Sequence, residues 1–134
     1  MSRILSLSEA ASIAIHGMIL VAKADKLVNV NQIAELTSSS RHHVAKVFQR
    51  LVKENFINSS RGPSGGFSLK KQPSEITFLD IYEAIEGKIE ITKCPLDKPI
   101  CPFNKCIFKN VINDLTIDFR TYMEEQSLDK YLEY

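Results

Sequence analysis

Three cysteines lie close together in the second half of the chain, at positions 94, 101 and 106. Thiolate sulfur is the usual ligand of iron–sulfur clusters and a common ligand of zinc, and both kinds of site need four ligands or an equivalent. Cys94, Cys101 and Cys106 can supply three of them, whereas an odd number of cysteines cannot form a closed disulfide set within one chain. Zinc is disfavoured because no Cys-x-x-Cys or His-x-x-x-His pair is present. Three metal-free thiols in a reducing cytoplasm are the other alternative.

A helix-turn-helix is predicted upstream of the cysteines. Asn29 and Gln32 match the two side chains of a capping box and predict a helix over residues 30–36. After a polar turn, apolar residues recur at steps of three and four and predict a second helix from residue 41 to about residue 55. Donors on its outer face suit DNA phosphates and guanine edges, although a solvated basic face is the alternative. With the N-cap candidate, the predicted DNA-binding residues here are Ser40, Arg41, His42, His43, Lys46 and Arg50.

A β-hairpin is predicted directly after that helix. Phe56-Ile57 and Phe67-Ser68-Leu69 have the composition of short strands, joined by a Gly- and Pro-rich loop over residues 58–66. A hairpin in this position is a wing, whose tip can lie beside the DNA minor groove. The candidate contacts at the tip are Arg61, Gly62 and Ser64. The alternative, a loop that cradles a nucleotide phosphate, lacks the G-x-x-x-x-G-K-[ST] pattern and a following helix start.

The charge of the chain is divided unevenly. The 134 residues are 44% hydrophobic, which is typical of a globular chain, and their formal net charge is only +1. Residues 1–72 hold ten Lys or Arg against four Asp or Glu, whereas residues 73–134 hold seven against twelve. The asymmetry predicts a basic half that binds an anionic partner and an acidic half with another role. The apolar run of residues 10–22 is too short and interrupted to span a bilayer, so we expect no membrane association and a cytoplasmic protein.

The acidic half is predicted to hold two more helices around the cysteine segment. Thr77 and Asp80 match a second capping box, and the helix that they open ends at Gly87. Three prolines among the cysteines prohibit regular helix and predict an irregular loop. Further on, apolar residues recur at steps of three and four and predict a long amphipathic helix over residues 107–126.

The apolar stripe of this last helix exceeds what a small winged domain can bury. The same helix of a second subunit would cover it in a two-fold dimer, and the alternative is that it folds back onto its own domain. We therefore expect a mostly α fold with a small β-hairpin wing. Its parts are a winged helix-turn-helix DNA-binding domain over 1–87, a cysteine-containing sensor loop over 88–106, and a dimerisation helix with C-terminal tail over 107–134. No Ser/His/Asp or paired-carboxylate pattern stands out, so no enzyme is expected.

The order of these features resembles the IscR/NsrR/CymR family of bacterial winged-helix transcription regulators over essentially the whole chain. The most specific segments are Arg61-Gly62-Pro63-Ser64-Gly65-Gly66-Phe67 in the wing and Ala84-Ile85-Glu86-Gly87 at a helix end. The resemblance implies a homodimer that binds palindromic double-stranded promoter DNA. Many members hold an iron–sulfur cluster, of [2Fe–2S] or [4Fe–4S] type, on three cysteines before the dimerisation helix, and this chain has three in that place.

The resemblance also indicates a source for the fourth cluster ligand. The cysteines are spaced by six residues and then four, where the best-known cluster-binding members have five and five. Lys109 occupies the place of a His ligand found in some members and cannot serve while protonated. In several relatives the first helix of the partner subunit supplies a carboxylate, which aligns with Ser12 here, or a His one turn later. His16 is thus the candidate and Glu9 the second choice; the alternative is that His16 is a hydrogen-bonded core residue.

Together the residues and the resemblance predict a repressor whose DNA binding is controlled by the cluster. The signal would be redox state, iron or cluster supply, or nitric oxide. A cluster-free regulator of the CymR type, responsive to thiol chemistry or to a partner protein, is an alternative. An iron–sulfur electron carrier or scaffold, in which the winged helix binds no DNA, is another.

Overall fold

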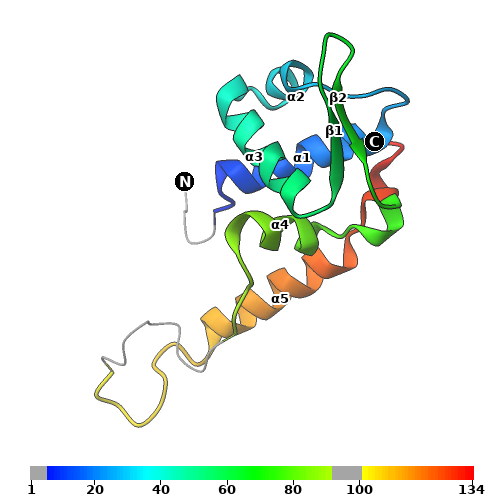
Figure 1. Cartoon of the computed structure of the whole chain (residues 1–134). Helices are drawn as coiled ribbons and strands as arrows, with labels where there is room; N and C mark the ends of the chain where they lie inside the picture. The colour runs from blue at the N-terminus through cyan, green and yellow to red at the C-terminus, as the bar shows by residue number, and fades with distance from the viewer. Residues whose placement is uncertain (1–5, 92–100) are drawn as a thin grey trace.

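The computed structural model describes residues 6–91 and 101–134. A helical body carries one two-stranded antiparallel hairpin (Figure 1). This architecture confirms the predicted fold class, in which a hairpin wing directly follows a helix-turn-helix. No helix in the described ranges is long and apolar enough to cross a membrane. The elements in chain order are α1 (Glu9–Lys23), α2 (Val30–Thr37), α3 (Arg41–Lys53), β1 (Ile57–Ser60), β2 (Gly66–Leu69), the 3-10 helix η1 (Pro73–Glu75), α4 (Phe78–Glu86), α5 (Val111–Glu125) and the 3-10 helix η2 (Leu128–Tyr131).

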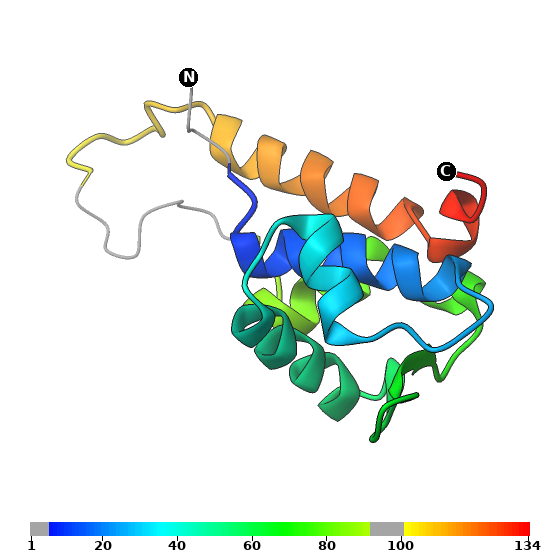
Figure 2. The ribbon, with the colours of Figure 1, turned by 90° about the horizontal axis from the view of Figure 1, so that it is seen from above.

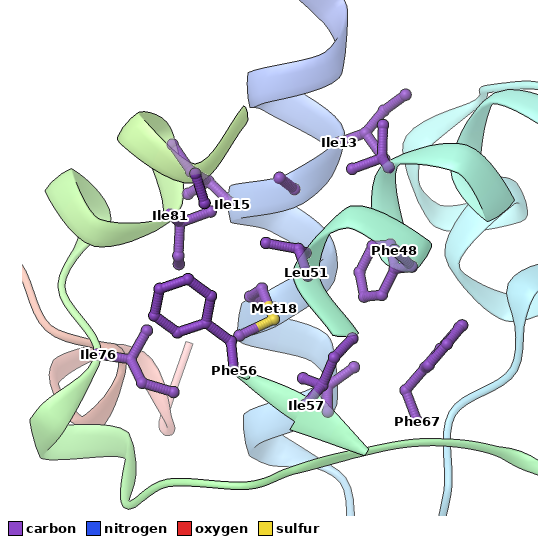
Figure 3. Close-up of a cluster of buried hydrophobic side chains, with 14 of the residues drawn as sticks. Ile13, Ile15, Met18, Phe48, Leu51, Phe56, Ile57, Phe67, Ile76 and Ile81 are labelled. Atoms are coloured by element: carbon purple, nitrogen blue, oxygen red, sulfur yellow. The ribbon is translucent and has the colours of Figure 1, made fainter. Parts of the chain in front are cut away.

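Helix α1 lies at the centre of the hydrophobic core. The side chain of its N-cap residue, Ser8, accepts the N–H of Ala11 at 3.1 Å. The helix packs against α2, α3 and α4, and α3 approaches so closely that a Cβ on Gly17 would lie 2.5 Å from Cζ of Phe48. The core therefore needs a glycine at this crossing. Figure 3 shows the α1 side chains of the core beside those of the neighbouring elements, among them Ile13, Ile15, Met18, Leu51, Ile57 and Ile81.

Local caps set the ends of the helix-turn-helix. The Asn29 side chain accepts the N–H of Gln32 at 2.9 Å, and the Gln32 side chain accepts the N–H of Asn29 at 2.9 Å, so the predicted capping box is formed. Helix α2 ends at Ser38, whose backbone is left-handed with φ 52°. Ser40 then opens α3, because its hydroxyl oxygen accepts the N–H of His43 at 3.1 Å.

The hairpin is longer than the sequence predicted. Its strands pair over four residues each, with Ser60 opposite Gly66 at the end of the ladder. The expected loop over residues 58–66 is therefore wrong, because residues 58–60 belong to β1 and only residues 61–65 form the turn. The sequence did not predict this part of β1 because the strand is polar and exposed beyond its first residue. It therefore lacks the alternation of apolar and polar residues that is typical of a half-buried strand.

Helix α4 has the ends that the sequence predicted. Thr77 accepts the N–H of Asp80 at 3.0 Å, and the Asp80 carboxylate accepts the N–H of Thr77 at 3.0 Å. The helix ends at Gly87, whose φ of 88° is one that glycine adopts easily. Both ends therefore follow from neighbouring residues alone.

Helix α5 starts later than predicted. Lys109 and Asn110 have φ of 51° and 65°, and such left-handed residues cannot continue a right-handed helix. Its C-terminal half packs on its own domain: Met123 is buried, and the ring of Phe119 lies edge-on to Tyr82 with centroids 5.4 Å apart. The alternative in which the helix folds back is therefore correct for this half. In the other half, apolar side chains stay exposed in the described part of the chain: Val111, Ile112, Leu115 and Ile117.

The C-terminal segment, which the sequence predicted only as a tail, completes the core. Leu128 is fully buried, and its N–H donates to the carbonyl oxygen of Ile76 at 3.0 Å. The ring of Tyr131 stacks on Phe78 with centroids 4.9 Å apart. The segment therefore joins η1 and the start of α4 to α1.

Candidate nucleic-acid interface and cysteine segment

Helix α3 has a buried face and an exposed basic face. Val44, Val47, Phe48 and Leu51 are buried in the core. His43 is half-buried, and the other donors on the outer side are exposed: Arg41, His42, Lys46, Gln49 and Arg50. Figure 2 shows α3 and the hairpin on one side of α1 and α5 on the opposite side. Two surfaces with different compositions are thus separated by the central helix.

The outer face of α3 includes a contact with α1. Nδ1 of His43 lies 3.5 Å from Oε1 of Glu9, whose side chain is 67% exposed. A pair so accessible to water contributes little to the free energy of folding. It nevertheless places a carboxylate beside the basic face of α3. Glu9, the second choice for a cluster ligand, is thus directed toward α3.

Arg50 makes contacts that the sequence did not suggest. Its Nε donates to the carbonyl oxygen of Ala84 at 3.1 Å, and the same nitrogen lies 3.6 Å from Oε1 of Glu54. Arg50 therefore ties the end of α3 to α4. Spacing could not predict this contact, because Ala84 lies 34 positions further along the chain.

The tip of the hairpin is held by glycines. The N–H of Gly65 donates to the carbonyl oxygen of Gly62 at 2.9 Å, and the φ of Gly62 is +102°. A Cβ on Gly65 would overlap the carbonyl oxygen of Ser60, so the turn requires glycine there. Arg61 borders, together with Gln49 of α3, a hollow of about 350 Å³ between the wing and that helix. The structure thus brings the predicted wing arginine close to the basic face of α3.

Two of the three candidate cluster cysteines lie within the described residues, and Cys94 lies outside them. Cys101 and Cys106 are free and exposed. The backbone N–H groups of Asn110 and Phe108 donate to the Cys106 sulfur and lower the pKa of this thiol, although desolvation acts in the opposite direction. The local backbone thus favours the thiolate form, which is the form that binds metals.

His16 is exposed, so its interpretation as a core residue is wrong. Its Nδ1 lies 2.7 Å from the backbone oxygen of Ser12 and 3.3 Å from the hydroxyl oxygen of the same residue. The ring borders an apolar groove of about 760 Å³ that is also lined by Ile19 of α1 and Phe119 of α5. In residues 6–91 and 101–134, no three His, Cys, Asp or Glu side chains converge as a metal site.

The fold and these surfaces define a class of protein. A capped helix-turn-helix with a basic second helix, followed by a glycine-closed hairpin, is a winged helix-turn-helix of the kind that binds DNA. A family profile, "Rrf2: Iron-dependent Transcriptional regulator", matches residues 7–134. The chain belongs to the Rrf2 family.

Individual relatives agree with this assignment. A putative HTH-type transcriptional regulator of Aquifex aeolicus (strain VF5) is 32% identical over 108 residues, which cover 78% of this chain and 75% of that protein. The HTH-type transcriptional regulator NsrR of Bacillus subtilis (strain 168) is 29% identical over 105 residues, covering 77% of this chain and 72% of NsrR.

Solved structures show the same fold. CymR, the global cysteine regulator of B. subtilis, matches with a TM-score of 0.79 at 22% identity, over 98% of both chains. IscR of T. potens matches with a TM-score of 0.76 at 21% identity, over 98% of this chain and 88% of that one. The resemblance drawn from the wing and helix-end motifs is thus confirmed. The chain is a DNA-binding transcriptional regulator and not an enzyme.

Proposed function

We propose that the chain is a cytoplasmic repressor that binds palindromic double-stranded promoter DNA as a homodimer. In this proposal α3 lies in the major groove and the wing tip lies at the minor groove. The observation that carries it is the separation in Figure 2: α3 and the wing share one side of α1, which leaves α5 on the opposite side for a second subunit. The proposed DNA contacts are Ser40, Arg41, His42, His43, Lys46 and Arg50 from the helix and Arg61, Gly62 and Ser64 from the wing.

The dimer is supported by apolar surface that one subunit leaves open. Val111, Leu115 and Tyr122 are 46%, 37% and 54% exposed, and at helical spacing they share one flank of α5. Tyr122 also lines the groove of about 760 Å³ between α1 and α5. A second copy, seated on this flank by a two-fold axis, would remove both apolar surfaces from water. The two α3 helices would then reach half-sites about one DNA turn, ~34 Å, apart or a multiple of it.

A matched pair of substitutions tests the dimer. Leu115→Glu puts a charge on the proposed contact flank, whereas Ile117→Glu puts the same charge on the opposite flank of α5. Light scattering should show a monomer for Leu115→Glu and a dimer for Ile117→Glu, with the helical circular dichroism of both unchanged. A dimer that survives Leu115→Glu would contradict the proposed interface.

The sensor part of the proposal rests on the donor set. Cys101 and Cys106 are accessible thiols, and the N–H groups that donate to the Cys106 sulfur are of the kind that stabilise cluster sulfurs. We propose that Cys94, Cys101, Cys106 and His16 of the partner subunit hold a [2Fe–2S] or [4Fe–4S] cluster. When bound, the cluster supplies a centre sensitive to redox state, iron or cluster supply, or nitric oxide.

The position of His16 suggests how the state of this site bears on DNA binding. His16 borders the groove toward α5, and the next residue, Gly17, contacts Phe48 of α3 in the core. A cluster bound to His16 would therefore act on α3 through the tightly packed crossing of α1 and α3. Since half-site spacing is set by the dimer, a small rotation of α1 would change how well both α3 helices fit.

Anaerobic purification tests the cluster directly. We expect visible absorption together with bound iron and sulfide, and His16→Ala should alter the spectrum or the lifetime of the cluster. His42→Ala, on the opposite side of the molecule, is the matched control and should leave both unchanged. Colourless, iron-free protein after anaerobic reconstitution would contradict the cluster and favour the cluster-free alternative. Salt-dependent binding to a palindromic duplex would argue against an electron carrier or scaffold.

A further inference from the structure

A second hollow lies on the side of the molecule that carries α3 and the wing. Its volume is about 410 Å³, and it is formed by the start of α2, the start of α3 and the wing. The polar residues that line it include Asn31 from α2, Arg41 from α3, and Ser59 and Ser60 from β1. All four residues are exposed, and none of their side chains makes a hydrogen bond or ion pair within the part of the chain that the structure describes. The hollow thus presents unused donors from three elements.

The walls of this hollow are held in place by backbone contacts. The N–H of Phe67 donates to the carbonyl oxygen of Val28 at 2.7 Å, and the N–H of Val28 donates back to Phe67 at 3.2 Å. At this contact a Cβ on Gly66 would lie 2.7 Å from the same Val28 oxygen. The wing is therefore fastened to the segment that leads into α2. The donors of the two elements keep a fixed separation as a result.

The chemistry of the lining is that of an anion site. Arg41 brings a positive charge, Asn31 an amide donor, and the β1 serines a hydroxyl donor, one and not two because successive side chains of a strand point to opposite faces. No Asp or Glu is among the lining residues. Such donors favour a phosphate group, whose oxygens accept several hydrogen bonds at once.

We propose that this hollow binds one phosphate of the DNA backbone in each half-site. The inference rests on the proposed function, because a strand that passes from the groove read by α3 to the groove beside the wing must cross between these elements. Asn31 and Ser59 are then DNA contacts that the sequence did not indicate. Arg41 contacts a phosphate rather than a base edge, so base recognition is left to His42, His43 and Lys46.

Salt dependence and matched variants test the assignment. The probe is a duplex that the wild-type protein selects from a random pool, compared with a scrambled duplex of the same composition. Asn31→Ala and Ser59→Ala should weaken binding to both duplexes by about tenfold for each half-site, the size expected for a hydrogen bond to a charged group. Asn58→Ala and Ser68→Ala, in the same hairpin but outside the hollow, should change affinity by less than about twofold.

Arg41→Ala should reduce the slope of log K against log salt by about one per half-site while the sequence preference stays the same. A changed preference with an unchanged slope would mean that Arg41 reads a base, and would overturn the assignment. Single phosphates of the duplex can be replaced by neutral methylphosphonates. At one position per half-site, this replacement should weaken binding of the wild type but not of Arg41→Ala. If the replacement and Arg41→Ala weaken binding additively at every position, the phosphate assignment would also be overturned.

Two controls separate the possible failures. Free ATP presents the same phosphate chemistry, and equilibrium dialysis should show no saturable binding of ATP to the protein. If ATP does bind and Ser60→Asp abolishes this binding, the ligand of the hollow would be a nucleotide instead. Lys46→Ala tests the α3 interface itself. If Lys46→Ala weakens DNA binding but the hollow variants do not, only the phosphate assignment fails. If none of them changes DNA binding, the proposed interface fails as well.

Discussion

Substituting Leu128 by Ala tests whether the C-terminal segment is part of the folded core. The side chain is 0% exposed. Removing three carbon atoms costs about 0.8 kcal/mol each in transfer free energy, and the cavity that remains raises the total to about 3.5 kcal/mol. For a chain of 134 residues the entropy of unfolding is about 0.28 kcal/mol/K, so the melting temperature should fall by about 12 °C.

Urea and thermal unfolding, followed by circular dichroism, measure this loss. All variants are compared at one protein concentration, because association adds to apparent stability. Leu128→Met keeps the volume and should cost less than about 1.5 kcal/mol. Tyr134→Ala lies in the same segment but is 80% exposed, and should cost less than about 0.5 kcal/mol. A loss below about 1 kcal/mol for Leu128→Ala, or one equal to that of Tyr134→Ala, would refute the docking of this segment.

Three smaller tests address the wing, the α1–α3 contact and the cysteine segment. Gly65→Ala places a Cβ against the carbonyl oxygen of Ser60 in β1 and should therefore distort the wing tip. In a gel shift, affinity for the promoter should fall about tenfold, ~1.4 kcal/mol, while the helical circular dichroism stays the same. An affinity equal to that of the wild type would contradict the tip geometry. Glu9→Gln removes a carboxylate that lies 3.5 Å from His43. The affinity for DNA should therefore rise about twofold at low salt, and this increase should disappear at high salt because salt screens the charge. An unchanged affinity at low salt would count against this reasoning. In metal-free protein, iodoacetamide should alkylate Cys106 at lower pH than Cys101, because the lowered pKa of Cys106 keeps more of this thiol as thiolate when the pH falls. Identical pH profiles of the two cysteines, measured by peptide mass spectrometry, would contradict this prediction.

The features that could be predicted from the sequence depend on near neighbours. The capping boxes at Asn29 and Thr77 form between residues three positions apart, so their chemistry is visible in the sequence. The turn glycines of the wing are equally local, and with the helix-end motif they were enough to indicate the family. The length of β1 was missed because pairing with β2, and not burial, holds its polar residues in a strand.

The site depended on contacts between distant segments. Arg50 is a proposed DNA contact, and the structure shows in addition that its Nε donates to the carbonyl oxygen of Ala84. His16 lies in an apolar run, yet it is exposed beside the groove between α1 and α5. Asn31 and Ser59 carry no motif at all, and become a candidate site only because the wing is fastened beside α2.

The helix caps, the wing turn and the class of protein are readable from the sequence, as are the number and spacing of the cysteines proposed as cluster ligands. These follow from short-range hydrogen bonding, backbone conformation and side-chain chemistry, which act over a few residues. Three further features depend on how the elements pack: which donors of the described residues are free, where His16 lies, and that Leu128 completes the core. Whether a side chain is buried, or a donor unpaired, depends on which elements pack together, and the local spacing of residues does not predict that packing.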